Sequence, residues 1–266
     1  MQQKDDEDVA LEDLDPTQRV FVQLGLRWHE DRSHQFLAIL LGTAGTGKTT
    51  TLKTLLAELR GRGIGKVLVG AYTGVAASNV GMGARTLHDL FRLAKVNEAS
   101  SDIMPLEEAD LKEFKEDMAG LEMLIIDEMS MVSRVVLAQV HARLREWRLA
   151  EGERDLADKP FGGVSVILAG DLGQLPPVAV SPSLSLLNSS TMHGAREQKA
   201  ANHGLRLFDQ FTTVVRLRRI HRQPGVSPYK ESLTRTRDGA MTKEDHQLWA
   251  SHDLTPGGSS CTLSSS

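Results

Sequence analysis

The segment Gly42–Thr49, with the sequence GTAGTGKT, has the residue types and spacing of a loop that binds phosphate. It matches G-x-x-x-x-G-K-[ST], follows the apolar run Phe36–Leu41 and precedes a helical pattern from Thr50 to Leu59. Glycines let backbone N–H groups wrap around phosphate oxygens, and the helix N-terminus adds partial positive charge. The predicted nucleotide-binding residues are Gly42, Thr43, Ala44, Gly45, Thr46, Gly47, Lys48, Thr49 and Thr50.

Two side chains of this segment have specific predicted roles. Lys48 would meet the β- and γ-phosphates of ATP, and the Thr49 hydroxyl would hold Mg²⁺. An ordinary glycine turn between a strand and a helix is the alternative. All four required positions and both flanks match the nucleotide-binding pattern, which favours the nucleotide site.

A pair of carboxylates, Asp127 and Glu128, follows the apolar run Leu124–Ile126. At the end of a buried strand next to the strand before the phosphate loop, such a pair can reach a bound metal and nucleotide. Asp127 would hold Mg²⁺, through a water, and Glu128 would deprotonate the attacking water. The alternative is a surface Asp-Glu pair, which is common at strand ends.

The segment Ala169–Pro177 presents Gln174 between a strand end and a stiff Pro-Pro. A neutral amide at that place can contact the γ-phosphate, or the attacking water, without competing for the metal. A surface turn stopped by proline would have the same sequence, and the residues alone do not choose between the two.

Small residues in Tyr72–Asn79, followed by Arg85–His88, are expected at the carboxyl edge of the same sheet, where ligands bind. They would let a nucleic-acid backbone approach closely without reading its bases. Close packing of a helix on the sheet also uses small residues, so both interpretations stay open.

The segment Arg216–Gln223 carries four arginines in seven residues. An arginine brought to the γ-phosphate stabilises charge in the transition state. A solvated basic strip or a phosphate-binding patch has the same composition, and position alone does not decide among these.

The composition, with 40% hydrophobic and 25% charged residues, is typical of a soluble globular protein. The formal net charge is −4, so a nucleic-acid partner would need a local basic surface. Cys261 is the one cysteine, which excludes disulfides within the chain. No apolar run approaches the ~20 residues that span a bilayer, and the acidic N-terminus resembles neither a secretory nor a mitochondrial signal. An intracellular location is expected.

The order of patterns along the chain predicts an α/β fold with a doubly wound parallel sheet. We expect residues 1–13 to form an acidic, disordered lead-in and residues 251–266 a disordered tail. We expect a surface insertion at 96–118, a long loop at 178–204 and a helix whose apolar stripe includes Leu137 and Trp147. The predicted strands are Phe36–Leu41, Lys66–Ala71, Leu121–Ile126, Val164–Ala169 and Thr213–Leu217.

Taken together, these segments resemble the Pif1-like DNA helicases of helicase superfamily 1. The motifs match those of the family in their order, their residues and their approximate spacing. The resemblance extends from about Leu14 to about Trp249. DEMSMV and GDLGQLPPV separate this family from kinases and most other P-loop ATPases. The motifs are GTAGTGKT, TGVAASN with TLH, LIIDEMSMV, VILAGDLGQLPPV and LRRIHRQ.

The resemblance implies a RecA-like P-loop domain at 14–222 and the helical start of a second motor domain at 223–250. It implies an ATP-dependent 5′→3′ DNA helicase of DNA repair, recombination or telomere maintenance, with ATP and Mg²⁺ as cofactors. Single-stranded DNA and DNA junctions would be its partners, with no membrane partner. The nucleus is the expected location and the mitochondrion the second choice; the oligomeric state is open.

The resemblance also assigns roles to single residues. Gln18, upstream of the phosphate loop, would read adenine, and Gln174 would sense the γ-phosphate. Arg222 would be the arginine finger of motif IV. The track for single-stranded DNA would include Thr73, Gly74 and His88.

Two departures from the family pattern shape the alternatives. Nothing after Trp249 supplies the motifs of a second RecA-like domain, and Gly173 replaces a bulkier residue. The alternative function is therefore a truncated fragment that binds ATP and single-stranded DNA without unwinding. A P-loop phosphotransferase would need an acceptor-binding lid, and DEMSMV with GDLGQLPPV argues against it.

Overall fold

The computed structural model describes residues 9–93, 104–177, 184–186, 188, 196–221, 228–237 and 239–251. The chain divides into two compact units, Met1–Arg222 and Gln223–Ser266. Each unit is described by itself below.

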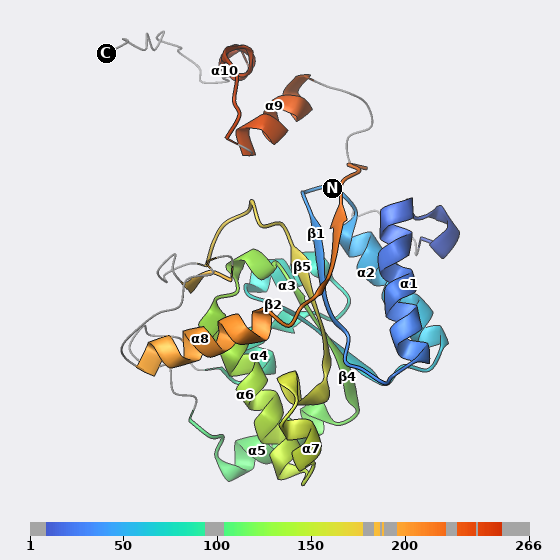
Figure 1. The fold of residues 1–266 in the computed structure, drawn as a ribbon, viewed down its shortest axis with the longest axis vertical. Coiled ribbons are helices and arrows are strands. Elements are labelled where there is room, and N and C mark those ends of the chain that lie inside the picture. The colour runs from blue at the N-terminus through green and yellow to red at the C-terminus, as the bar shows by residue number, and fades with distance from the viewer. Residues whose placement is uncertain are drawn as a thin grey trace. The chain divides into compact units, whose positions relative to one another are not determined.

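A parallel sheet organises the first unit (Figure 1). Among the described residues it has six strands in the order β3-β2-β4-β5-β1-β6, and every pairing is parallel. The predicted parallel α/β sheet is confirmed. The strands are β1 (Leu37–Gly42), β2 (Lys66–Ala71), β3 (Arg85–Thr86), β4 (Leu121–Asp127), β5 (Ser165–Gly170) and β6 (Thr213–Leu217).

Helices cover both faces of this sheet, as its continuous apolar strands require. Leu37, Ile39 and Leu41 of β1 pack into one hydrophobic cluster, whereas Ala38 and Leu40 pack into the other. This alternation follows from the two-residue period of a strand. The helices are α1 (Pro16–Glu30), α2 (Lys48–Gly61), α3 (Gly74–Val80), α4 (Leu87–Leu90), α5 (Glu108–Met118), α6 (Arg134–Ala150), α7 (Arg154–Ala157) and α8 (Arg196–Phe208), with 3-10 turns at Leu11–Asp13, Met129–Met131 and Pro160–Gly163.

Four features differ from the sequence-based expectations. The lead-in at 1–13, expected to be disordered, contains the 3-10 turn Leu11–Asp13. The expected insertion at 96–118 contains α5, whose Phe114 and Met118 are buried in the core. The expected loop at 178–204 is wrong over 196–204, which lie in α8. The strand before Asp127 does not neighbour β1, because β5 pairs with both β4 and β1.

Helix α8 forms because its apolar residues recur at helical spacing and reach a partner helix. Ala201 and Leu205 are buried, and α8 packs against α6. Gly204 allows this close approach, since a Cβ at that position would collide with the backbone carbonyl of Arg134. The Ser- and Ala-rich sequence around this helix hides its short apolar stripe.

No helix in the described ranges is both long and apolar enough to cross a bilayer.

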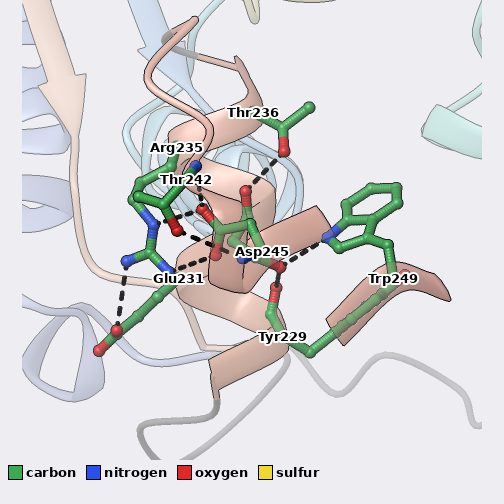
Figure 2. Close-up of polar contacts among 8 residues, drawn as sticks. Tyr229, Glu231, Arg235, Thr236, Thr242, Asp245 and Trp249 are labelled. Carbon is green, nitrogen blue, oxygen red and sulfur yellow. Dashed lines mark hydrogen bonds and ion pairs between the residues drawn. The ribbon is translucent and has the colours of Figure 1, made fainter. Parts of the chain in front are cut away.

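The second unit contains α9 (Pro228–Arg237) and α10 (Lys243–Ala250), held together by a polar network (Figure 2). The Arg235 guanidinium donates two bonds to Asp245, of 2.8 and 2.6 Å. The Trp249 indole donates to the Ser232 hydroxyl at 2.9 Å. The bonds from Arg235 and from the Thr242 backbone keep the pKa of Asp245 below its ordinary value. This carboxylate therefore both caps α10 and ties it to α9.

His141 of α6 lies in the packed region between α6, α8 and the turn at Phe161. Its Nδ1 accepts the Phe161 N–H at 2.9 Å, and its ring centroid is 5.0 Å from that of His203. Burial first, then the positive charges of His203 and Arg145, lower the pKa of His141 to about 4. The folded chain thus holds this ring neutral.

Replacing His141 with Asn is expected to reduce the loss of stability at acid pH. In the unfolded chain a histidine takes up its proton at about pH 6.5, whereas in the folded chain His141 does so at about pH 4. The stability that the neutral ring contributes is therefore fully present above about pH 6.5 and is lost as the pH falls toward 4. From about pH 7.5 to about pH 5 the wild type should lose about 2 kcal/mol on this account. Asn can still accept from Phe161 and does not titrate.

Urea unfolding of both proteins at the two pH values measures the difference. His34→Asn, at an exposed histidine, is the matched control and should behave as wild type. Equal pH slopes for wild type and His141→Asn would contradict the assignment.

Candidate nucleotide site

A cavity of about 640 Å³ lies at the carboxyl edge of the sheet, where β1, β4 and β5 end. Nine of the predicted site residues line it: Ala44, Gly45, Gly47, Lys48, Thr49, Thr50, Asp127, Glu128 and Gln174. Four further residues, to which the sequence had assigned no individual role, complete the wall: Ala76, Val80, Gly170 and His221. The structure thus brings the two halves of the predicted chemistry around one space.

The phosphate loop, residues 42–49, passes from β1 into α2 and is held by bonds within itself. Thr46 is buried, and its hydroxyl donates to the carbonyl of Thr43 at 2.8 Å. Gly42 leaves room for this hydroxyl, which a Cβ would strike. Gly47 has φ +82°, a left-handed conformation that only glycine adopts at little cost. The loop's shape therefore follows directly from its glycines and Thr46.

Lys48 is the first residue of α2, so its ammonium and the helix N-terminus place positive charge at the same wall. The Lys48 Nζ donates to the Gly42 carbonyl at 2.7 Å. Thr49, half-buried, follows on the cavity side. This arrangement suits an anion that carries several phosphate oxygens.

Asp127 ends β4 as a buried carboxylate, only 7% exposed. Its Oδ1 is buried and has no hydrogen-bond partner in the described part of the chain. Burial raises the pKa of Asp127, and the Glu128 N–H and the charge of Lys48 oppose that shift only in part. An unpaired carboxylate oxygen and the Thr49 hydroxyl on one cavity are oxygen donors suited to a hard divalent cation.

Glu128 has φ +52° and ψ +46°, which is rare for a residue with a side chain. Such strain is concentrated at functional sites. Burial, and next the charge of Asp127, raise the pKa of Glu128. Gly170 makes room for this turn, since a Cβ there would lie 2.8 Å from Met129 Cγ and 3.0 Å from Met129 N. A half-buried carboxylate with a raised pKa is suited to take a proton from water.

Gln174 lies on the loop that follows β5, exposed on the cavity wall. Asp171, buried, orders this loop by accepting the Gly173 N–H at 3.0 Å, and its carbonyl accepts the Gln174 N–H at 3.1 Å. Strand β5 lies between β4, which carries the two carboxylates, and β1, which leads into the phosphate loop. The loop that carries Gln174 follows β5 and therefore begins between these two groups. Asp171 was in the motif, but its role was not foreseen.

Gln18 lies behind the phosphate loop with its amide already bonded at both ends. Its Oε1 accepts the Asp15 N–H at 3.0 Å, and its Nε2 donates to the Thr46 carbonyl at 3.2 Å. His221, which sequence reasoning missed, bonds to the same region: its Nε2 lies 2.9 Å from Asp15 Oδ2. The one feature of the sequence that could have pointed to His221 is its position next to Arg222, the predicted arginine finger. Reading of adenine by Gln18 stays a prediction.

The predicted DNA-track residues lie at the same edge but do not line the cavity. Thr73 caps α3 by accepting the Ala76 N–H at 3.1 Å, and Gly74 is exposed with open space where a Cβ would point. His88 is half-buried edge-on to Tyr72, and burial lowers its pKa. The predicted arginine finger, Arg222, lies outside the described residues.

Comparisons with known proteins agree with these observations. The family model of PIF1-like helicases matches residues 16–247. The ATP-dependent DNA helicase Pif1 of Psychrobacter sp. is 37% identical over 140 residues, which are 52% of this chain and 19% of the relative. The ATP-dependent DNA helicase PIF1 of Saccharomyces cerevisiae is 29% identical over 204 residues, 76% of this chain and 21% of the relative.

Solved structures show the same likeness. A Pif1 chain from a study of DNA unwinding at forked dsDNA has a TM-score of 0.64 and 28% identity, over 88% of this chain and 50% of that one. Bacteroides Pif1 bound to ssDNA has a TM-score of 0.62 and 25% identity, over 92% and 51%. Bacteroides sp. Pif1 in complex with ADP-AlF4 has a TM-score of 0.59 and 27% identity, over 89% and 49%.

This chain thus spans about a fifth of the length of the curated relatives and about half of the solved chains that it matches. The family model, however, covers most of it, including the phosphate loop, the Asp127–Glu128 pair and the Gln174 loop. The chain belongs to the family of Pif1-like helicases.

Proposed function

We propose that this protein is an ATP-dependent DNA helicase whose ATP site is the cavity at the carboxyl edge of β1, β4 and β5. The observation that carries the proposal is the convergence of Lys48, Asp127, Glu128 and Gln174 on that cavity. A structural glycine turn would not require an ammonium, two carboxylates and an amide on one wall. Membership of the Pif1-like family supports the same function.

The residues divide the work of hydrolysis. Lys48 and the start of α2 would bind the phosphates. Thr49 and Asp127 would hold Mg²⁺, which fits the buried Asp127 Oδ1 that has no hydrogen-bond partner among the described residues. A bound magnesium ion would neutralise charge on the phosphates. Glu128 accepts the proton of the attacking water, with a pKa raised toward the working pH. Gln174 contacts the γ-phosphate and Arg222 stabilises the developing charge.

Contact with DNA is proposed for Thr73, Gly74 and His88. Gly74 and the partly exposed Thr73 offer backbone and hydroxyl groups beside the ATP site, which suits a phosphate backbone more than a base edge. The similar Bacteroides chains were solved with ssDNA and with ADP-AlF4, which supports the pairing of the two ligands.

The finer parts of the proposal follow the family. They are single-stranded DNA and DNA junctions as partners, 5′→3′ translocation, and work in repair, recombination or telomere maintenance in the nucleus or mitochondrion. A second candidate is a stretch that binds ATP and single-stranded DNA without unwinding. This chain matches about half of each solved Pif1 chain. A strand-displacement assay on a forked duplex separates the two.

Replacing Lys48 with Ala is expected to reduce ATP turnover at least about 100-fold, because the ammonium at the phosphates is lost. Circular dichroism should show an unchanged fold. Lys66→Ala is the matched control and should retain turnover. Lys66 is the first residue of β2 and so lies at the edge of the sheet opposite the cavity. Wild-type turnover by Lys48→Ala would reject the assigned site.

Replacing Glu128 with Gln is expected to leave ATP affinity within a few-fold of wild type while hydrolysis falls by about 100-fold or more. The amide keeps the size of the side chain but cannot accept the proton. Titration calorimetry and a phosphate-release assay measure the two quantities. Glu122→Gln, at the other end of β4, is the control. Loss of ATP affinity in Glu128→Gln would contradict its role as base.

Replacing Gly74 with Asp is expected to weaken binding of single-stranded DNA at least about tenfold at low salt, because the new charge repels phosphate. The side chain enters open space, so the fold should be unaffected. Gly61→Asp adds the same charge in open space at the end of α2 and should bind as wild type. Fluorescence anisotropy with an oligothymidine measures both, and equal affinities would remove Gly74 from the DNA track.

A further inference from the structure

Helices α6 and α8 meet along a row of basic side chains that lies apart from the nucleotide cavity. On α8, Lys199, His203 and Arg206 follow one another at spacings of four and three residues, so they share one face of the helix. On α6, His141 and Arg145 are also four residues apart. None of these five residues lines the cavity. We call Arg145, Lys199, His203 and Arg206 the basic patch.

Direct contacts join the two helices at this row. The ring centroids of His141 and His203 are 5.0 Å apart, and Arg206 Nη2 lies 3.5 Å from His203 Nδ1. Gly204, next to His203, lets α8 approach α6 closely, since a Cβ there would collide with the Arg134 carbonyl. The packing of the two helices therefore holds the basic side chains of α8 beside those of α6.

The charges of the basic patch are not neutralised by nearby carboxylates. Two other arginines of α6 form ion pairs of 2.6 Å, Arg143 with Glu146 and Arg148 with Glu153. Arg145, although exposed, forms no ion pair in the described ranges, and the same holds for the exposed lysine and arginine that α8 contributes to the patch. These three cations are therefore available to an anion from outside.

The pKa values of the two histidines agree with a positive surrounding. Burial first, then the charges of His203 and Arg145, lower the pKa of His141 to about 4. Burial, and next the charge of Arg206, lower the pKa of His203. In both cases the neighbouring charges that act on the ring are positive. A surface of this kind attracts an anion.

The dimensions and charge of the patch suit a chain of phosphates. Lys199 and Arg206 are seven residues apart on α8, which is about 10 Å along the helix axis. Phosphates of one DNA strand follow one another at about 3.4 Å along the duplex axis, so the stripe extends over about three of them. The whole chain has a formal net charge of −4, so this patch is the local basic surface that a nucleic-acid partner needs.

We propose that the basic patch binds the phosphate backbone of DNA, as a second contact surface apart from the predicted DNA track. The choice of DNA among polyanions rests on the proposed function. The track residues Thr73, Gly74 and His88 belong to α3, its N-cap and α4, whereas the patch belongs to α6 and α8. Contacts of lysine and arginine with phosphates add affinity for DNA of any sequence.

The triple variant Arg145→Gln/Lys199→Gln/Arg206→Gln tests the patch. It is expected to bind DNA at least about tenfold more weakly at low salt, and the slope of log affinity against log salt should become shallower by about two to three. Each lost phosphate contact means that about one counterion fewer is released on binding. Fluorescence anisotropy with an oligothymidine and with a mixed-sequence duplex measures both quantities. ATP turnover without DNA should be unchanged.

A matched control removes the same charges elsewhere. Arg27→Gln/Arg60→Gln/Lys112→Gln replaces two arginines and one lysine at exposed positions of α1, α2 and α5, and should bind DNA within about twofold of wild type. Arg145→Lys/Arg206→Lys keeps the positive charges and should retain most of the affinity. Circular dichroism checks the fold of each variant.

Two comparisons identify the DNA and separate the patch from the track. A larger loss with the duplex assigns the patch to double-stranded DNA, and a larger loss with the oligothymidine assigns it to a single strand. Adding Gly74→Asp to the triple variant should multiply the two losses, because independent surfaces contribute additively to the binding free energy. A combined loss no greater than that of Gly74→Asp alone would overturn the patch as a separate surface.

Other results would overturn the patch while the proposed function stands. One is equal DNA affinity in the triple patch variant and the matched control, beside weaker binding by Gly74→Asp. Another is unchanged DNA affinity together with lost binding to polyglutamate, which would assign the patch to an acidic polypeptide. A wild-type chain that binds neither DNA would instead overturn the proposed function, and with it the choice of DNA for the patch.

Discussion

The nucleotide cavity depends on three adjacent parallel strands ending at the same level. Leu41 of β1 pairs with Gly170 of β5, and Ile126 of β4 pairs with Leu168 of β5. Since parallel strands all emerge at one edge, the phosphate loop, the Gln174 loop and the Asp127–Glu128 pair must share that edge. A slip of one residue in either pairing would turn each side chain to the opposite face and separate these groups. The backbone hydrogen bonds between these strands thus determine where the side chains of the site lie.

The same arrangement places the carboxyl groups of Asp127 and Glu128 where burial disfavours their ionised forms. Asp127 lies in the interior, where one of its oxygens has no hydrogen-bond partner among the described residues, and Glu128 has a strained backbone beside it. Both carboxylates have raised pKa values, and Lys48 offsets that shift only in part. A strained backbone and a buried, unpaired charge both carry a free-energy cost, and such costs are concentrated at functional sites. The core strands on either side supply the stability that such a site requires.

Local chemistry predicted much of this site, and non-local pairing explains what it missed. The segment GTAGTGKT and the Asp127–Glu128 pair are recognised from a few consecutive residues, so their positions at strand ends could be predicted. The insertion of β5 between β4 and β1 could not, because strand order depends on contacts far apart in the sequence. Helix α8 was missed because its apolar stripe is short. Asp15 and His221 were missed as a pair because 206 residues separate them.

The sheet is unequal along its width, and this has a consequence for motion. Strand β1 is paired on both sides along most of its length, whereas β3 joins β2 through only two residue pairs, Gly70 with Arg85 and Ala71 with Thr86. Segments held by few buried bonds open locally at low free-energy cost, without unfolding the centre. Strand β3 is therefore held to the sheet by fewer backbone bonds than β1, and amide protons of Arg85 and Thr86 should exchange with solvent long before those of β1.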